Sequence, residues 1–484
     1  MGIKNPKPAS HGGKKAPMIT PTSGNARPPQ NAVRFVQSPV KLTISLLVSN
    51  RIDTIRKCLN SIKPLMDALP CELIVVGTVG PGRSDGSLAV AREFTDRIVR
   101  FEWCDDFSAA RNAGLELASG EWFLFLDDDE WFEDVSEIID FLKTEDGRYN
   151  TCLFRQRNYK DYVGRQHSDG HVERLARRSD ALRFKDRIHE YLDGTMPDLK
   201  ELDVYVHHYG YIFDSQEAFE KHHLRNLEPL EKSLEERPGY LRTITHLAQE
   251  YHRAHDFEKM DALCRDALDK NDHPENGNYI SVIAYFYIHA LIKLKKWKDL
   301  SEQSVRILRR TDISPLAKAG IRYQLNECAF AFFDAEGMLS NLDAYFHLVD
   351  TLDADADQLA SQQIMAMDAC MLEHSRAGMM ECGIQRAIEM GDEGRIWAYI
   401  RRAVSKPGEN HLILEKCLPM MVSYAMEKGA FETLYPLIGP HLQKDSSMDC
   451  FLSAVQSCLE PAALYKTQVR LAEYLNTLNL DKPY

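Results

Sequence analysis

The sequence lacks any apolar run long enough to cross a membrane. A helix that spans a bilayer needs roughly 20 consecutive apolar residues, and no such stretch occurs in the 484 residues of this chain. The first residues also lack the apolar segment of a secretory signal. We therefore expect a protein of the cytoplasm with no transmembrane segment.

Cysteine pairs with metal-site spacing are absent too. The 11 cysteines are scattered from Cys58 to Cys458, and no two of them form a CxxC pair. A dispersed, odd-numbered set is typical of reduced and mostly buried thiols. The sequence gives no sign of a disulfide framework or of a zinc site.

Charge is unevenly distributed along the chain. The net charge of the chain is −13, yet residues 1–40 contain six basic residues and no acidic one, so the remainder is more acidic still. A folded body of this charge repels phosphate backbones, and we expect no nucleic-acid partner. The same 40 residues hold seven prolines and four glycines. We expect residues 1–40 to form a disordered basic tail.

An abrupt change at residue 41 marks the start of a predicted α/β domain. Leu42–Val48 and Leu73–Val76 are nearly continuous apolar runs, as in strands that are buried on both faces. Two further strands are expected at residues 97–101 and 122–126. Strands of this length that alternate with helices imply right-handed crossovers and a mainly parallel sheet.

Three helices are predicted between these strands. Apolar residues recur at helical spacing from Ile55 to Met66, and Asp53 is the candidate N-cap of this helix. The other two helices are expected at residues 88–94 and 108–118. Ligands of such sheets bind outside the carboxyl ends of the strands. The loops expected to bind ligand are therefore those that follow Val48, Val76 and Leu126.

Beyond residue 216 the strand pattern stops, and amphipathic helices follow one another. The segment 246–257 is similar to the segment 284–297, and looser matches fall at residues 329–338 and 423–431. Paired helices that recur at about 40 residues are typical of a tetratricopeptide-like solenoid. A plain helical bundle is the alternative. The predicted organisation is a tail at 1–40, an α/β domain at 41–215 and an α-helical domain at 216–484.

An acidic cluster, Asp127–Glu130, follows the fourth predicted strand directly. Four neighbouring acids are costly to hold together unless they share a cation or are fully solvated. Hard divalent ions prefer carboxylate oxygens, and Mg²⁺ usually completes its shell with substrate phosphates. Asp127 and Asp129 can point into the same cleft, with Asp128 turned away or toward a sugar.

The residues before this cluster resemble a known family. The segment 106–122, followed by the cluster at 127–130, resembles the RNxGxxxAxG and DxD signatures of family 2 glycosyltransferases with the GT-A fold. The order and spacing of the two motifs match over about 25 residues. The resemblance implies a nucleotide-sugar-binding α/β domain, a nucleotide-sugar donor, which we expect to be UDP-linked, and Mg²⁺ or Mn²⁺ as cofactor. Asn112 and Gly114 are expected to serve the turn and the helix packing.

The resemblance also implies roles for individual residues. In this family the DxD carboxylates hold the metal ion against the diphosphate of the donor, and the matching residues of this chain are Asp127 and Asp129. Arg111 is expected near the nucleotide, where Asp127 and Asp128 also lie. Asp128 is expected nearer the ribose or the sugar.

Two loops depart from the family pattern. The loop 77–87 keeps Ser84–Ser87 of the family's VDxGSxDGT stretch, but Gly77 replaces the aspartate that often reads the base. The acid that the family has after its first strand is replaced by Arg51. A helix cap is the alternative role for Asp85. The residues of these loops that are expected to bind the nucleotide sugar are Ser49, Asn50, Arg51 and Asp85.

Two later segments indicate which members of the family this chain resembles. Residues 174–192 and 207–211 resemble the RLFRR…HE and HxGY segments of family 2 transferases that carry C-terminal tetratricopeptide helices. These enzymes include peptide S-glycosyltransferases of bacteriocin pathways and relatives that act on cell-surface glycans. His208 is a candidate third metal ligand, and a packed or solvated side chain is the alternative. The resemblance covers residues 41–215 in sequence and the helical half in architecture alone.

The implied mechanism is one direct displacement at the anomeric carbon, because family 2 enzymes are inverting. A carboxylate then removes the acceptor proton. The family's usual ED base motif is absent from its expected place, and the best substitute is Glu190, followed by Asp186. His189 is expected to orient Glu190 or to contact phosphate. A thiol acceptor, with its lower pKa, would need a weaker base.

The leading hypothesis is an enzyme that glycosylates a peptide or protein docked on the helical domain, since concave solenoids suit extended peptides. A second hypothesis has a cell-surface glycan or lipid-linked saccharide as acceptor, with the helices serving oligomerisation such as a homodimer. A third is a non-catalytic scaffold with a degenerate transferase domain. The departures at Gly77 and Arg51 favour the scaffold, whereas the intact DxD motif favours the enzyme.

Overall fold

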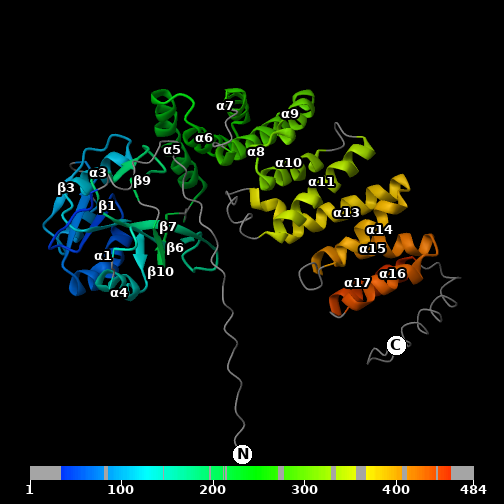
Figure 1. Ribbon diagram of the computed structural model, residues 1–484, viewed down its shortest axis with the longest axis horizontal. Coiled ribbons are helices and arrows are strands. Elements are labelled where there is room, and N and C mark those ends of the chain that lie inside the picture. Colours follow the sequence, from blue (N-terminus) through cyan, green and yellow to red (C-terminus); the bar gives the residue numbers. More distant parts are fainter. Residues whose placement is uncertain are drawn as a thin grey trace, which may run out of the picture. The chain divides into compact units, whose positions relative to one another are not determined.

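The computed structural model describes residues 34–80, 85–144, 147–195, 198–210, 212, 215–270, 277–328, 334–355, 367–405, 411–442 and 445–458. The chain divides between His255 and Asp256 into two compact units (Figure 1). The described residues 34–255 are called the sheet unit below, and those from 256 onward the helical unit. Four parts of the sequence predictions lie outside the described residues: residues 1–33 of the tail, 81–84 of the loop 77–87, Tyr211 of the segment 207–211, and 329–333 of the repeat match at 329–338.

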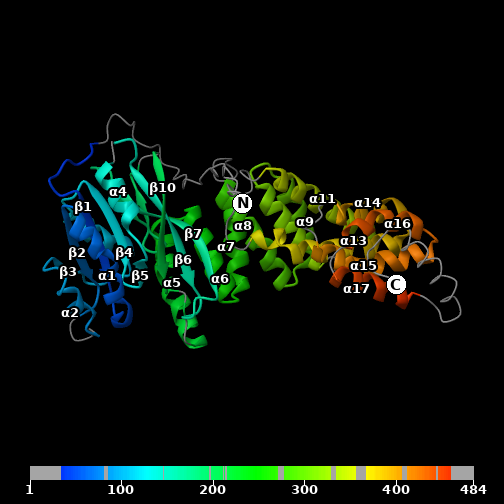
Figure 2. The ribbon, with the colours of Figure 1, turned by 90° about the horizontal axis from the view of Figure 1, so that it is seen from below.

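An eight-stranded sheet forms the centre of the sheet unit, in the order β3-β2-β1-β4-β7-β6-β10-β5. Its strands are β1 (Leu42–Val48), β2 (Cys71–Gly77), β3 (Ile98–Arg100), β4 (Trp122–Asp127), β5 (Glu130–Phe132), β6 (Thr151–Tyr159), β7 (His167–Arg177) and β10 (Leu199–His208). The first four strands are parallel to one another, and Figure 2 shows them side by side. β7 runs antiparallel between β4 and β6, and β5 is an antiparallel edge strand. The predicted α/β fold with a mainly parallel sheet is confirmed.

Six helices and a small hairpin complete the sheet unit. The helices are α1 (Ile52–Ala68), α2 (Ser87–Ala91), α3 (Phe107–Glu116), α4 (Ser136–Thr144), α5 (Gln216–Glu236) and α6 (Leu241–Arg253). Strands β8 (Arg183–Lys185) and β9 (Tyr191–Asp193) pair with each other apart from the main sheet. The helices α5 and α6, which the sequence places in the helical domain, belong to the same compact unit as the sheet.

The N-termini of two helices show how the loops at the strand ends are fixed. The prediction that Asp53 caps α1 is wrong, because α1 begins at Ile52 and Asp53 already lies in its first turn. The carboxylate of Asp85, from a different loop, accepts the Ile52 N–H at 2.9 Å instead. Helix α3 is capped by Asp106, which accepts the Ala109 N–H at 2.8 Å.

Helix α3 lies unusually close to the sheet. A Cβ atom added to Gly114 would collide with the side chain of Ser45 on β1 and would come within 3.1 Å of Val76 on β2. The side chain of Asn112 donates to Phe184 O and accepts from Phe184 N–H, each at 2.9 Å, and so ties α3 to β8. Both residues therefore have the packing roles that the sequence predicts for them.

The first described residues are attached to the sheet unit. Phe35 forms an isolated β-bridge with Ser179, and Val36 N–H donates to Arg178 O at 3.0 Å. The guanidinium of Arg177 lies 4.7 Å from the centre of the Phe35 ring. Residues 34–40, which the sequence assigns to the disordered tail, are therefore held by backbone hydrogen bonds.

The helical unit contains only helices in its described part. They are α7 (Phe257–Lys270), α8 (Gly277–Lys293), α9 (Trp297–Arg309), α10 (Pro315–Glu327), α11 (Ala335–Ala354), η4 (Met367–Met371), α13 (Glu373–Met390), α14 (Glu393–Ala403), α15 (His411–Glu427), α16 (Phe431–Ile438), η5 (Gly439–His441) and α17 (Asp445–Ser457). Each packs on helices near it in sequence, such as α7 on α8, α10 on α11 and α13 on α15. Contacts between near neighbours are typical of helical repeats. No helix in the described ranges combines the length and the apolarity that crossing a bilayer requires.

Candidate active site

The candidate site lies at the carboxyl ends of β1 and β4. Strand β1 has β2 on one side and β4 on the other, so the chain order reverses there, as at the ligand-binding switch point of other α/β sheets. The N–H and the hydroxyl of Ser49, directly after β1, donate to Oδ2 of Asp128 at 2.7 and 3.1 Å. Thr54 Oγ1 donates to Asp128 O at 2.8 Å. These bonds join the loop after β1 and the first turn of α1 to the acidic cluster.

Asp129 and His208 face one another across this site. Oδ1 of Asp129 lies 3.5 Å from Nε2 of His208, and its Oδ2 lies 3.4 Å from Nη2 of Arg51. Nδ1 of His208 is 2.7 Å from Oδ1 of Asn158 on β6. Tyr209 N–H donates to Asp129 O at 3.3 Å, which brings the end of β10 against the acidic turn. The imidazole is therefore fixed with its Nε2 toward the carboxylate.

Burial and mutual repulsion disfavour negative charge on two of the aspartates. Burial raises the pKa of Asp128 to about 7, and the neighbouring charge of Asp129 contributes to the rise. Burial likewise raises the pKa of Asp129, although His208 opposes this effect. Two such carboxylates side by side would be stabilised by a bound cation.

Asp127 instead faces two arginines. Its Oδ1 accepts from Nη2 of Arg111 at 2.8 Å, and Nη2 of Arg174 lies 3.9 Å from its Oδ2. Burial raises the pKa of Asp127, but the attraction of Arg111 and Arg174 outweighs burial, and the pKa falls below its ordinary value. Arg111, only 5% exposed, also donates from Nε to Glu190 at 2.6 Å. Arg111 thus links the end of β4 to the loop that carries Glu190.

Glu130 holds the acidic turn in place, a role that the sequence does not reveal. Its carboxylate is fully buried at the start of β5 and accepts from Arg174 and, at 2.7 Å, from Nε2 of Gln156. It also accepts the backbone N–H of Asp127 at 3.1 Å. The sequence shows only that Glu130 is the fourth acid of the cluster. Its side-chain partners come from β6 and β7, which are distant in sequence, so local spacing does not predict this role.

Asp85 and Asn50 tie two loops together. The carboxylate of Asp85 accepts from Ile52 N–H at 2.9 Å and from the N–H and hydroxyl of Ser87 at 2.9 and 2.6 Å. Asn50 Oδ1 accepts the Asp85 N–H at 3.1 Å. Asp85 therefore holds the N-terminus of α1 against that of α2, in the helix-capping role that the sequence allows as the alternative.

The two candidate bases have different surroundings. The side chain of Asp186 is 6% exposed and forms ion pairs with Arg237 and, at 3.1 Å, with Nε of Arg242. The side chain of Glu190 is 14% exposed and pairs with Arg111. Glu190 is therefore the one that lies beside the acidic cluster.

His189 lies between these two candidate bases in sequence. Its ring stacks on that of His246 in α6, with the ring centres 4.2 Å apart. Burial lowers the pKa of both imidazoles. The ring of His189 therefore packs against helix α6.

Helix α5 contributes an arginine, Arg225, to the site, and the sequence analysis does not predict this contribution. The guanidinium of Arg225 lies 5.8 Å from the centre of the Phe107 ring on α3. Burial lowers the pKa of Arg225, and Arg51 lowers it further, whereas Asp129 and Asp127 act in the opposite direction. Two arginines that repel each other beside an acidic cluster form a place where a multivalent anion would be stabilised.

The site fits a metal ion that shares its ligands with a substrate. Within the described ranges, no three His, Cys, Asp or Glu side chains form a metal-binding group. Such a group is not required, since Mg²⁺ commonly binds one or two protein side chains and completes its shell with phosphate and water. Adjacent ligands of an octahedral ion lie roughly 3 Å apart, close to the 3.5 Å between Asp129 Oδ1 and His208 Nε2.

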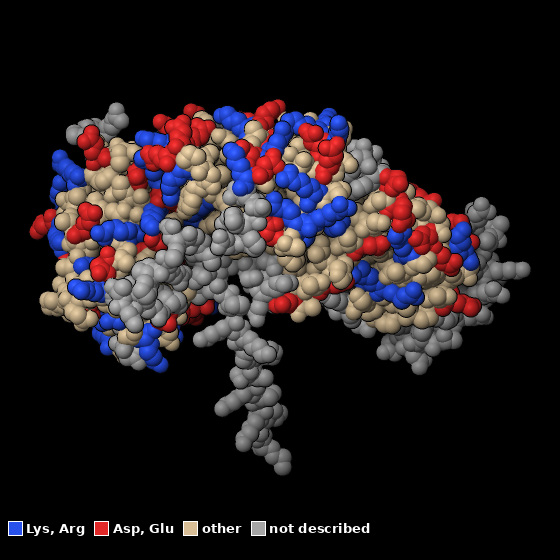
Figure 3. All heavy atoms as spheres, turned by 45° about the horizontal axis from the view of Figure 1, so that its top comes forward, with Lys and Arg blue, Asp and Glu red and all other residues tan. Residues whose placement is uncertain are grey.

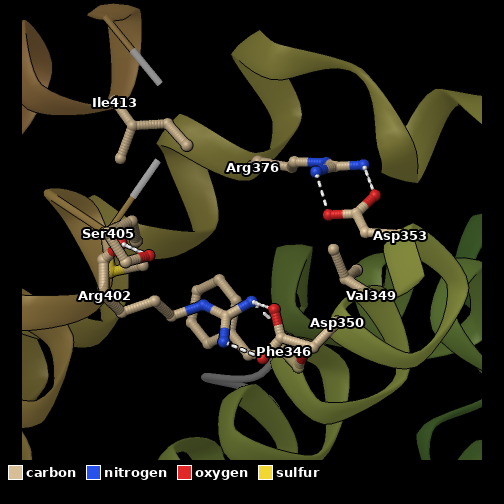
Figure 4. A pocket seen from close by; sticks show the side chains of 9 residues that line it. Phe346, Val349, Asp350, Asp353, Arg376, Arg402, Ser405 and Ile413 are labelled. Carbon is tan, nitrogen blue, oxygen red and sulfur yellow. Dashed lines mark hydrogen bonds and ion pairs between the residues drawn. The ribbon is translucent and has the colours of Figure 1, made fainter. Parts of the chain in front are cut away.

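A second concave place occurs in the helical unit, between α11, α13, α14 and α15. Figure 4 shows Arg376 and Arg402 reaching toward acidic residues of α11. Arg376 donates to both carboxylate oxygens of Asp353 at 2.8 Å, and Arg402 pairs with Asp350. Because both arginines are already neutralised, this pocket offers no charge to an anionic ligand.

Comparisons with known proteins agree with the geometry of the sheet unit. Residues 43–202 match the family described as "Glycosyl transferase family 2". A TPR repeat-containing protein of Synechococcus elongatus is 29% identical over 181 residues, which are 35% of this chain and 42% of that protein. The SPbeta prophage-derived glycosyltransferase SunS of Bacillus subtilis is 25% identical over 224 residues, 44% of this chain and 49% of that protein. The chain thus spans less than half the length of these relatives.

Among solved structures, S. aureus TarS 1–349 in complex with UDP-GlcNAc is 12% identical, with a TM-score of 0.29 over 65% of this chain and 92% of that one. The mannosyltransferase PcManGT from Pyrobaculum calidifontis, in complex with GDP-Man and Mn²⁺, is 12% identical, with a TM-score of 0.30 over 67% and 90% of the two chains. At these TM-scores neither ligand can be transferred to this protein. The family match and the acidic site at the strand ends together show that residues 43–202 of this chain form a glycosyl transferase family 2 domain.

Proposed function

We propose that this protein transfers a sugar from a nucleotide-sugar donor to a peptide or protein acceptor, with a divalent metal ion bound at Asp129 and His208. The observation that carries the proposal is the 3.5 Å approach of Asp129 Oδ1 to His208 Nε2 at the switch point of a family 2 domain. The raised pKa of Asp128 and of Asp129 supports it, because a cation would relieve the repulsion between them.

Charged side chains around this pair suit a nucleoside diphosphate. Arg51 and Arg225 supply positive charge on the side of Asp129, where the diphosphate would lie. Asp128, oriented by Ser49, is the proposed contact of the ribose or the sugar. The bound Mg²⁺ or Mn²⁺ would take up the negative charge that develops on the departing diphosphate. A UDP-linked sugar is the donor that we propose to test first.

Glu190 is the proposed base of a single inverting displacement. It lies beside the acidic cluster through Arg111, which bonds both Glu190 and Asp127. An acceptor with an acidic proton, such as a cysteine thiol, would reduce the need for a strong base.

The helical unit supports a peptide or protein as the acceptor. Its helices pack on near neighbours in sequence, as in repeat proteins that bind extended peptides. A saccharide acceptor is the competing hypothesis, and a peptide array incubated with the preferred donor separates the two.

Thermal unfolding with a panel of UDP- and GDP-linked sugars, with and without Mn²⁺, tests the donor and the metal. We expect one donor to raise Tm only when Mn²⁺ is present, since a ligand at 100 times its Kd stabilises the folded state by about 2.7 kcal/mol. Asp129→Ala should remove this response, whereas Asp203→Ala, at a carboxylate that is 72% exposed, should keep it. If no donor stabilises the wild-type protein, the enzyme proposal is wrong and the scaffold hypothesis takes its place.

A further inference from the structure

The loop 186–190, which carries Glu190, has a strained backbone. Asp186 and His189 adopt φ angles of 72° and 54°, in the left-handed region that non-glycine residues rarely occupy. Such conformations cost about 1–3 kcal/mol each and persist only where the surrounding contacts impose them. Contacts from other elements must therefore hold this loop.

Asp186 is held by arginines of the α5–α6 hairpin. Its Oδ1 pairs with Arg237, which follows α5, and its Oδ2 pairs with Nε of Arg242 in α6 at 3.1 Å. Both carboxylate oxygens are thus engaged, and the side chain is 6% exposed. Two ion pairs and low exposure make Asp186 a poorer candidate than Glu190 for removing an acceptor proton.

The neighbours of Asp186 are held by the same hairpin. Arg187 donates from Nε and Nη2 to Glu236 at 3.1 and 2.6 Å, while Arg187 O accepts the Phe107 N–H of α3 at 2.7 Å. His189 O accepts from Nη2 of Arg242 at 2.8 Å. The ring stack between His189 and His246 adds a further contact. Asp186, Arg187 and His189 therefore each contact the α5–α6 region directly.

Arg242 takes part in several of these contacts. It binds the carboxylate of Asp186 and the carbonyl of His189, the two residues with left-handed backbone, and so spans the turn that leads into Glu190. Glu190 in turn meets Arg111 at 2.6 Å. A shift of this turn would move the Glu190 carboxylate away from the acidic cluster.

We propose that Asp186 is a positioning residue rather than the base, and that the α5–α6 hairpin, through Arg242 and Arg237, sets the position of Glu190. The role of Glu190 as the base rests on the proposed function, whereas the positioning of the loop does not. The catalytic unit then extends to residue 255 instead of ending at 215.

Hydrogen exchange tests the positioning without any activity measurement. The Phe107 amide reports on the loop because its acceptor is Arg187 O. Asp186→Asn keeps the volume of the side chain and tolerates the left-handed backbone, so it removes the charge alone. Both Asp186→Asn and Arg242→Gln should speed exchange at Phe107 by about tenfold or more. Arg56→Gln, which breaks an exposed bidentate pair with Glu93, is the matched control.

A double-mutant cycle on donor hydrolysis in the full chain separates positioning from catalysis. If Asp186 acts through Arg242, each single variant should lower kcat by about 10- to 100-fold, with the donor KM unchanged. The double variant should then be no worse than the poorer single one, and Arg242→Lys should recover part of kcat. A further large loss of kcat when Asp186→Asn is added to Arg242→Gln would show that Asp186 is the base and overturn the proposal. Unchanged exchange at Phe107 in both single variants would also overturn it, whereas an inactive wild type with faster exchange in the variants would refute the proposed function alone.

Discussion

At the scale of single residues, three consecutive aspartates have three different electrostatic surroundings. Asp127 faces the guanidinium groups of Arg111 and Arg174, Asp128 accepts hydrogen bonds from Ser49, and Asp129 faces His208. The pKa of Asp127 is lowered, and those of Asp128 and Asp129 are raised. The surrounding strands and loops therefore give three identical side chains different tendencies to carry negative charge.

The raised pKa of Asp128 predicts a stability that depends on pH. Folding favours the protonated carboxyl, so its contribution to stability is complete below the ordinary aspartate pKa and is lost as the pH rises through about 7. Asp128→Asn should therefore raise Tm at pH 8 by at least about 2 °C in metal-free buffer. The difference should disappear near pH 4, as measured by thermal unfolding across that range.

Asp127→Asn is the matched comparison, with the opposite sign. Its pKa is lowered by Arg111 and Arg174, so the contribution of the ionised form is present above the ordinary aspartate pKa and is lost as the pH falls. This variant should lower Tm at pH 8, because Arg111 and Arg174 each lose one of their carboxylate partners. A rise in Tm for both variants would contradict the assignment of separate roles.

Arg225 gives a prediction for donor binding. Arg225→Gln should raise the donor KM about tenfold, the effect of losing one charge-assisted contact of about 1.5 kcal/mol. Arg225→Lys should recover part of the affinity at low ionic strength. Leu224→Ala, at the adjacent residue whose side chain is 66% exposed, is the control that should leave KM unchanged. An unchanged KM in Arg225→Gln would exclude a contact with the donor.

At the scale of elements, the first four strands and the helices between them follow from local sequence. Apolar runs such as Leu42–Val48 coincide with strands because parallel strands are buried on both faces. The antiparallel insertion of β7 between β4 and β6 is not encoded in any such run. Its consequence for the site is large, since Arg174 reaches Glu130 only through this register.

Only the part of the candidate site that lies in local sequence motifs could be predicted. Asp129 and Arg111 lie in motifs of local spacing, and the structure places both in the acidic site. Other residues of the site come from elements that are distant in sequence, so no motif spacing predicts them. They are Asn158, Gln156 and Arg225. The wrong N-cap has the same origin, because the partner of the α1 N-terminus is Asp85 from another loop.

Gly114 tests the close contact between α3 and the sheet. A methyl group at this position would collide with the side chain of Ser45 and crowd Val76. Gly114→Ala should lower the free energy of unfolding by about 1–3 kcal/mol, the usual cost of overpacking. Gly170→Ala is the control, because no atom lies within 4 Å of its added Cβ. Equal stability of the two variants in urea titrations would refute the close packing.

At the scale of the whole molecule, the boundary between the two units falls at residues 255 and 256, well after the last strand. The charged side chains on the face shown in Figure 3 mix both signs, although the chain carries a net charge of −13. The two arginines proposed to face the diphosphate, Arg51 and Arg225, interact electrostatically with Asp129 of the acidic cluster.

Two truncations test the proposal that the sheet unit binds the donor and the helical unit docks the acceptor. A chain that ends after His255 keeps the hairpin that holds the Glu190 loop, so it should retain donor hydrolysis and lose transfer to peptides. A chain that ends after Ser215 removes Arg237 and Arg242, and it should lose hydrolysis as well. Retained peptide transfer by the first truncation, measured by mass spectrometry, would contradict acceptor docking on the helical unit.

The central claim is that Asp129 and His208 bind a divalent ion together with the donor. Calorimetric titration of Mn²⁺ into the protein, with and without a UDP-sugar, tests it most directly. The proposal predicts Mn²⁺ binding that is at least about tenfold tighter with the donor present, and a loss of this coupling in Asp129→Asn and in His208→Gln. Coupling that survives in both variants, or Mn²⁺ affinity that ignores every donor, would contradict it.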